Sequence, residues 1–319
     1  MINRSLIRVK AFQELYSRVC VNNFETEPAK RELVVACNKS VELFALIAAL
    51  PASLALAASD RVISERRKFT QDTALIERME RFASNSYSKM ISSSAALTEQ
   101  IKSIGISWRN DLDVPLKSIF NSIIKSSYFA DYLAIPSPTL ADEIKLFKNI
   151  YSHEVGGNAL LEAALEECSI WWADDLAFVV NYLLNKLSSF AKKGDVEIPP
   201  LFKEPADKEF ALKLVGNLLV NYDEYAEMVS DNLNNWELSR LVLADVLIAS
   251  MGIAEAVTFE DIPLKVTINE YVDLAKYYST PRSYIFVNGV LNKLLKELAK
   301  EGKIKKNPLG MVGSQNFFE

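Results

Sequence analysis

The sequence is poor in residues that form turns and in residues that bind metals. Its 319 residues include only 10 glycines, 11 prolines, three cysteines and one histidine. Scarce glycine and proline, together with much Leu, Ala, Lys and Glu, predict long helices and few hairpins. The cysteines lie far apart with no Cys-x-x-Cys pair, so they predict neither a disulfide framework nor a zinc site. We expect buried thiols in a reducing cytoplasm.

Recognisable catalytic and cofactor motifs are also missing. The single histidine, His153, lies near no nucleophile motif such as Gly-x-Ser-x-Gly, which favours a structural or surface role for it. The nearest glycine-rich segment, VGGN at 155–158, matches neither the dinucleotide nor the Walker pattern. We therefore expect a protein that is not an enzyme and that has no catalytic residue, cofactor or metal.

The most apolar run, VELFALIAALPASLALAA at 41–58, raises the question of a membrane span. A span needs about 20 apolar residues, whereas this run has Glu42 near its start and Pro51 in its middle. We interpret it as two buried helices broken at Pro51. The opening residues, MINRSLIRVK, have no apolar core of a signal peptide. We expect a cytoplasmic protein that does not bind membranes.

Residues 3–21 form a clear amphipathic pattern. Asn3 is a candidate N-cap for this helix. At about 100° per residue one face carries apolar side chains; these are Leu6, Val9, Phe12, Tyr16 and Cys20. The opposite face carries Arg4, Arg8 and Arg18. Three arginines on one face either bind phosphates through their charge and forked donors or simply keep the helix soluble.

Charge is unevenly distributed along the chain. The net charge is −5, yet residues 1–24 carry four basic side chains and one acidic side chain. Residues 203–273 carry five basic and fourteen acidic side chains. A basic end and an acidic body predict two partners of opposite charge, with ordinary solvated helix surface as the alternative.

Several short blocks in the second half of the chain occur in a familiar order. They are NNWELSRLVLADVLI with Trp236, Leu238 and Arg240, then Glu255, IPLKV at 262–266, INE at 268–270, LAK at 274–276 and FVNGVL at 286–291. Near the start, QELY at 13–16 belongs to the same series. In these blocks the chain resembles the NusB family of transcription antitermination factors, over about 1–24 and 206–298.

The resemblance implies an all-α fold of NusB-like helical bundles with an additional helical region inserted after the first helix. The expected parts are a basic N-terminal helix (1–24), the inserted helical region (25–190), a proline-rich linker (191–206), a NusB-like helical domain (207–298) and a mobile basic tail (299–319). The resemblance also implies boxA-like single-stranded RNA, a NusE-type small-subunit ribosomal protein and the transcription elongation complex as partners, in rRNA transcription.

The same resemblance implies candidate site residues. For RNA binding they are Arg4, Arg8, Lys10, Arg18, Arg282 and Phe286; for partner binding they are Tyr16 and Glu255. For Tyr16 and Phe286 a core-facing ring is the alternative, and for Glu255 an ordinary surface carboxylate. Ser5 and Leu6 stand where the short form of the family has more arginine, which predicts weaker RNA binding by this helix.

Other residues of these blocks suggest an architectural role. Pro263 and the pair Asn288-Gly289 are expected to set helix starts and a close helix approach. Two other function classes stay open at this point. One is a protein-protein adaptor that has lost RNA binding; the other is an RNA-modifying enzyme, since NusB-like domains also precede methyltransferase domains.

Overall fold

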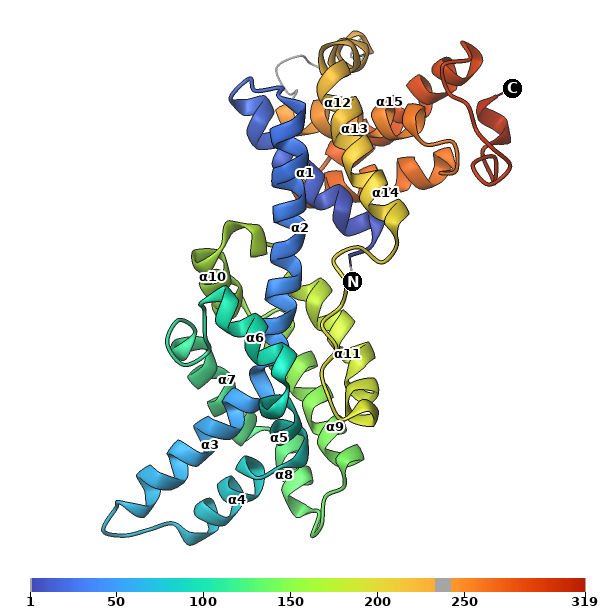
Figure 1. Ribbon diagram of the computed structural model, residues 1–319. Helices are drawn as coiled ribbons and strands as arrows, with labels where there is room; N and C mark the ends of the chain where they lie inside the picture. Colours follow the sequence, from blue (N-terminus) through green and yellow to red (C-terminus); the bar gives the residue numbers. More distant parts are fainter. Residues whose placement is uncertain (1, 233–241, 319) are drawn as a thin grey trace. The chain divides into compact units, whose positions relative to one another are not determined.

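Most of the chain that the structure describes is helical. The computed structural model describes residues 2–232 and 242–318, and within them we find helices, turns and one isolated bridge between Ile2 and Phe202, but no strand (Figure 1). The predicted all-α class is confirmed.

The helices form two units, each with its own contacts. We call residues 2–37 and 202–319 the terminal unit, and residues 38–201 the central unit. The boundary between them falls inside one helix, α2 (Thr26–Ala48). The expected insertion from residue 25 therefore differs from the structural unit, because a helix that starts in the terminal unit continues into the central one.

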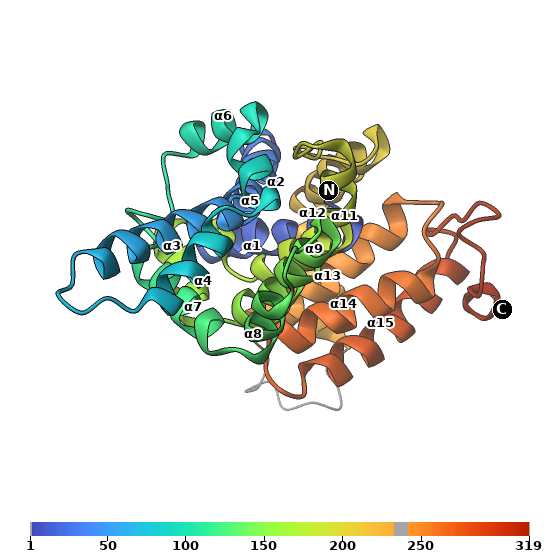
Figure 2. The ribbon, with the colours of Figure 1, turned by 90° about the horizontal axis from the view of Figure 1, so that it is seen from below.

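In the terminal unit, α13 (Leu243–Thr258) is the central helix. Every residue of α13 from Ala244 to Ala256 is buried. Four other helices of the unit pack around it. They are α1 (Arg4–Cys20), α12 (Pro205–Asp231), α14 (Leu264–Tyr278) and α15 (Ser283–Lys300). Helices α14 and α15 lie side by side (Figures 1 and 2).

The close approach of two helices depends on Gly252. A Cβ atom there would lie 2.8 Å from Leu291 Cδ2, so a side chain at this position would require the buried Leu291 of α15 to shift. We expected Gly289 to allow a close helix approach, but a Cβ atom at Gly289 would have no other atom within 4 Å. That expectation is wrong. Pro263, by contrast, lies directly before α14, as expected for a residue at a helix start.

The C-terminal segment packs on the terminal unit and differs from the mobile tail that we expected. Ile304 and Phe317 are buried, and the Ser314 hydroxyl accepts the Leu264 N–H at 3.0 Å at the start of α14. Lys306 Nζ donates to the Phe259 carbonyl at 2.5 Å. The segment thus supplies both apolar burial and polar partners, ending in the short 3₁₀ turn η4 (Gln315–Phe317).

The central unit surrounds a core rich in aromatic side chains, among them Phe44, Phe82, Tyr87 and Phe147. Its elements after α2 follow in chain order: α3 (Leu50–Arg66), α4 (Thr73–Ala83), α5 (Ser86–Ser93), α6 (Ala95–Ile104), α7 (Asp113–Lys125), α8 (Ser127–Ala134), α9 (Leu140–Ile150), the π-helical turn η1 (Tyr151–Val155), α10 (Ala159–Cys168), the 3₁₀ turn η2 (Ile170–Trp172) and α11 (Leu176–Lys193).

The apolar run at 41–58 is broken where we predicted. Helix α2 ends at Ala48 and α3 begins at Leu50, with Pro51 in its first turn. Proline lacks the N–H that would bond the carbonyl four residues earlier, and the Tyr151 hydroxyl donates to that Ile47 carbonyl at 2.9 Å instead. The indole of Trp108 donates to the neighbouring Leu46 carbonyl at 2.7 Å. Aromatic donors therefore stabilise the break.

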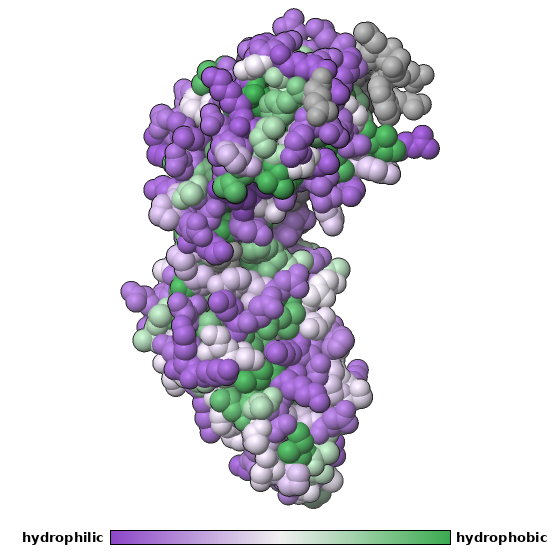
Figure 3. Space-filling model, turned by 90° about the vertical axis from the view of Figure 1, so that its right-hand side faces the viewer, coloured by the Kyte–Doolittle hydropathy of each residue, from purple (hydrophilic) through white to green (hydrophobic). Residues whose placement is uncertain are grey.

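By length and composition alone, Thr26–Arg66 includes a segment able to cross a membrane. In the fold, 67% of that segment is buried. The face in Figure 3 is mostly hydrophilic, with scattered apolar residues on it. Burial inside the central unit accounts for the apolar composition, as expected for core helices.

Candidate functional site: charged residues of the first helix

The charged face expected on α1 is largely buried. Arg8 is 4% exposed and makes a forked contact with Glu255, Nε to Oε2 at 2.7 Å and Nη2 to Oε1 at 2.9 Å. Glu255 is fully buried and also accepts hydrogen bonds from the hydroxyls of Thr267 at 2.9 Å and Tyr271 at 3.1 Å. One carboxylate therefore joins α1, α13 and α14.

The surroundings of Arg8 keep its guanidinium charged. Burial by itself lowers the pKa of Arg8, but the charge and hydrogen bonds of Glu255, together with the charges of Tyr271 and Glu270, outweigh it, so the pKa is raised. Burial, and then the Glu255 carboxylate, raise the pKa of Tyr271, which keeps its hydroxyl a donor. The Arg8 guanidinium also lies over the Phe210 ring, 5.1 Å from its centroid.

The burial corrects two expectations. Arg8 does not face solvent where RNA would bind, and Glu255 does not face a protein partner. Their roles in this fold are structural, because a buried, fully hydrogen-bonded ion pair fixes the packing of three helices. The partners Thr267 and Tyr271 were missed in the sequence; both lie one or two helical turns beyond Pro263, on the side of α14 that faces α13.

Lys10 and Arg18 are buried as well, contrary to the expected exposed face. Lys10 is 0% exposed and Arg18 is 5% exposed. Arg18 contacts Glu14 within its own helix and Glu32 of α2, with Nη2 to Oε2 at 2.7 Å. The fully buried apolar positions of α1 are Ile7, Ala11 and Leu15. This i, i+4, i+8 stripe is the signal that would have placed the core face correctly.

The remaining candidates divide between surface and core. Arg4 is half-buried and reaches Asp207 and Asp261, each at 3.4 Å. Arg282 is exposed just before α15, and Tyr16 is 37% exposed beside the Phe12 ring. Phe286 is 5% exposed and belongs to the core, which matches the alternative given for it above.

Three candidates therefore remain at the surface of the terminal unit: Arg4, Arg282 and Tyr16. Arginine at a solvent-exposed position presents a planar cation that suits phosphate. Among the described residues, no group of three or more His, Cys, Asp or Glu side chains is placed to hold a metal ion.

Comparison with known proteins identifies the family. A model of the NusB family matches residues 175–296. A protein named Transcription antitermination protein NusB from Salinibacter ruber is 35% identical over 120 residues, which cover 38% of this chain and 75% of that protein. The chain belongs to the NusB family.

Two further relatives carry the same name. The NusB protein of Chloroherpeton thalassium is 34% identical over 105 residues, 33% of this chain and 50% of that protein. The NusB protein of Finegoldia magna is 39% identical over 90 residues, 28% of this chain and 66% of that protein. No solved structure gives a significant match.

Membership in the NusB family confirms the resemblance and assigns a class. NusB proteins are transcription antitermination factors and not enzymes, which removes the RNA-modifying alternative. The family match begins at residue 175, in the central unit and directly before α11. Trp236, Leu238 and Arg240, which carry part of the resemblance, lie outside the described residues.

Proposed function

We propose that this protein is a cytoplasmic transcription antitermination factor that binds boxA-like single-stranded RNA together with a NusE-type small-subunit ribosomal protein. In this proposal it acts within the transcription elongation complex during rRNA transcription. Family membership is the observation that carries the proposal. The surface of the terminal unit supplies the chemistry that each partner needs.

The RNA contacts that we propose are Arg4 and Arg282. Both lie at the beginning of a helix of the terminal unit, and neither is sealed in the core. The two carboxylates near Arg4 are 3.4 Å away, so these ion pairs are long, and a phosphate can replace them. Unpaired bases of single-stranded RNA stack on aromatic rings and on arginine planes.

The partner contact that we propose combines Tyr16 with acidic surface. Tyr16 is an exposed aromatic side chain, the type enriched in protein interfaces. Helix α12 adds exposed carboxylates at Asp223, Glu224, Glu227 and Asp231. An acidic face of this kind complements a basic ribosomal protein and accelerates its association.

A titration with boxA-like RNA, with and without the NusE-type protein and at two salt concentrations, tests the proposal. We expect binding that tightens with the partner and weakens steeply with salt, since phosphate neutralisation releases counterions. The double variant Arg4→Glu/Arg282→Glu should bind RNA at least about tenfold more weakly. Arg67→Glu/Arg78→Glu, at two exposed positions of the central unit, is the charge-matched control.

A second function is favoured by one observation. The burial of Arg8, Lys10 and Arg18 removes three of the four basic side chains of α1 that we expected to bind RNA. A protein-protein adaptor that no longer binds RNA needs none of them. If the protein binds the NusE-type partner in this titration but shows no RNA affinity with or without it, the adaptor is the correct function.

A further inference from the structure

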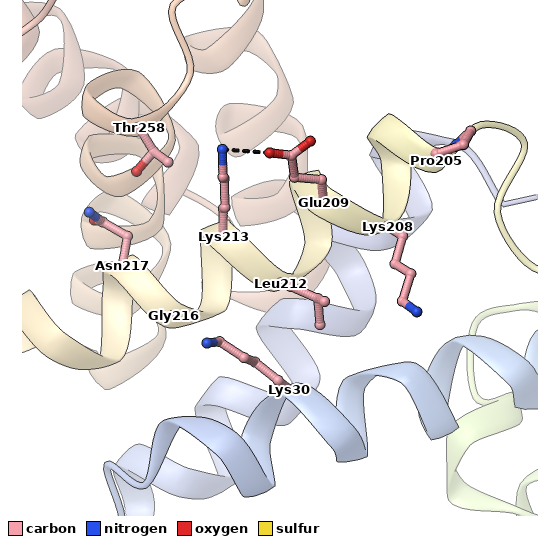
Figure 4. Close-up of a pocket in the computed structure, with 9 residues that line it drawn as sticks. All are labelled: Lys30, Pro205, Lys208, Glu209, Leu212, Lys213, Gly216, Asn217 and Thr258. Atoms are coloured by element: carbon pink, nitrogen blue, oxygen red, sulfur yellow. Dashed lines mark ion pairs between the residues drawn. The ribbon is translucent and has the colours of Figure 1, made fainter.

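A groove of the terminal unit runs along one side of α12. Its volume is about 650 Å³, and it is lined by Lys30 of α2, by Thr258 at the end of α13 and by residues of α12. Figure 4 shows these side chains, with Lys30 reaching toward α12 from the neighbouring helix. The α12 residues are Pro205, Lys208, Glu209, Leu212, Lys213, Gly216 and Asn217.

The lining is basic. Three lysines face one carboxylate, Glu209. Lys213 pairs with Glu209 at 2.6 Å, and Lys30 pairs with Glu27 at 2.8 Å. Both pairs lie within a single helix, and all their carboxylates are more than half exposed. Such exposed pairs contribute little and exchange readily, so these lysines can turn to an incoming anion.

Gly216 brings Lys30 into the groove. A Cβ atom at Gly216 would lie 3.0 Å from Lys30 Cε and 3.5 Å from its Nζ. The Lys30 side chain therefore lies against α12 at a position where α12 has no side chain. Glycine inside a helix is destabilising relative to alanine, and at this position it leaves room for the Lys30 side chain.

The groove also offers an unused polar group and apolar surface. The Thr258 hydroxyl oxygen is buried and has no hydrogen-bond partner among the described residues. Leu212 and Pro205 provide apolar wall. Cations, an uncommitted hydroxyl and apolar surface together match a nucleotide, which has a phosphate, a polar sugar and a flat base.

We propose that this groove binds the phosphodiester backbone of single-stranded RNA, with Lys30, Lys208 and Lys213 as phosphate contacts. The inference rests on the proposed function and extends it to residues outside α1. Lysine acts as a point charge without the forked geometry of arginine, so these contacts hold the strand without reading its sequence. The groove therefore adds affinity for any single strand, and specificity for boxA-like RNA comes from elsewhere.

Charge-reversal variants of the full-length protein test the groove. Lys208→Glu/Lys213→Glu changes two groove lysines, and Lys293→Glu/Lys296→Glu changes two exposed lysines of α15 by the same charge. Titrated with a boxA-like RNA and with an oligouridine of equal length, the groove variant should lose at least about tenfold in affinity for both. Its salt slope should fall by about 1.4, the value for two phosphate contacts on a single strand.

The outcomes separate the groove from the proposed function. If the groove variant and the α15 variant lose the same affinity, the groove proposal is overturned, while RNA binding by the protein stands. If the wild-type protein binds neither RNA, the proposed function fails and the groove fails with it. A poly-glutamate peptide that binds the groove lysines while neither RNA does would make the site one for acidic protein segments.

A second variant separates binding from folding. In Gly216→Ala the end of the flexible Lys30 side chain has to give by only a few tenths of an ångström, so we expect the helix to gain stability and Tm to rise with RNA affinity unchanged. Gly289→Ala in α15 has nothing within 4 Å of its new Cβ and should raise Tm without changing RNA affinity. Lys30→Gln removes the charge of the third proposed contact and should weaken binding of both RNAs; unchanged RNA affinity in that variant would remove Lys30 from the proposed contacts.

Discussion

At the scale of the residue, the role of a cation in this protein follows from what surrounds it. Arg8 and Lys30 both belong to the terminal unit, yet Arg8 is sealed against a buried carboxylate while Lys30 holds an exposed one. Removing a buried partner leaves an uncompensated charge, whereas an exposed pair is replaced by water at little cost. Burial thus decides which of the two is structural and which is available to a ligand.

The buried carboxylate gives the sharpest test at this scale. Glu255→Gln keeps the shape of the side chain but removes the charge that holds Arg8, and we expect it to lower the free energy of unfolding by about 2–4 kcal/mol. Glu32→Gln removes an exposed partner of Arg18 and should cost at most about 1 kcal/mol. Urea unfolding followed by circular dichroism measures both.

A different result would restore the surface role first inferred for Glu255. For a surface role, the Glu255→Gln protein would have to be at least as stable as the Glu32→Gln protein. It would also have to bind the NusE-type protein more weakly than the Glu32→Gln protein does. Binding should be measured below the unfolding transition of each variant, so that loss of fold is not counted as loss of a contact.

Lys306 makes stability depend on pH. Burial lowers its pKa from 10.5 to about 8, while Glu255, Asp261 and Glu260 partly oppose the shift. Between about pH 8 and 10.5 the unfolded chain binds more protons at this site, so stability rises with pH through that range. In Lys306→Met the rise should be absent, a difference on the order of 2 kcal/mol. Chemical unfolding of both proteins from pH 7 to 10 measures it; parallel curves would contradict the prediction.

At the scale of the element, the sequence predicted features that depend on local chemistry. The break in the apolar run follows from the missing N–H of Pro51, and the start of α1 follows from Asn3, whose side chain accepts the Leu6 N–H at 2.9 Å. The side of α1 that is buried could not be found this way, because Arg8 and Lys10 were interpreted as solvated. Their burial depends on side chains of distant helices.

The packing of the C-terminal segment was also not predicted, because it too depends on contacts with distant residues. It can be tested at Gly310. A Cβ atom at Gly310 would lie 2.0 Å from the Glu260 carbonyl oxygen, a backbone atom that cannot move aside. Gly310→Ala should therefore detach the segment and lower stability by about 1–3 kcal/mol. Limited proteolysis should then cleave within 303–318. The control Gly289→Ala should resist cleavage, since its methyl group meets nothing; equal resistance in both would mean that the segment does not rely on Gly310.

At the scale of the whole molecule, the family blocks and the proline-rich segment predicted that an extra helical region is present. They did not predict its boundary at residues 37–38, because α2 continues through that point with no turn residue to mark it. A periodic helical pattern indicates where a helix runs but not which core each of its turns joins. Only the contacts of the folded chain divide α2 between the two units.

Because each unit has its own core, we predict that a core substitution in one unit destabilises that unit and leaves the other intact. Phe147 is fully buried in the central unit against Phe82 and Tyr87, and Phe147→Ala should cost about 3–5 kcal/mol. Hydrogen exchange read by mass spectrometry should then accelerate within 38–201 and stay unchanged within 243–300, with RNA affinity preserved.

Leu291 is fully buried in the terminal unit. Leu291→Ala should give the reverse exchange pattern and lose RNA binding as that unit opens. Faster exchange throughout the chain in both variants would mean that the two units unfold together as one cooperative structure.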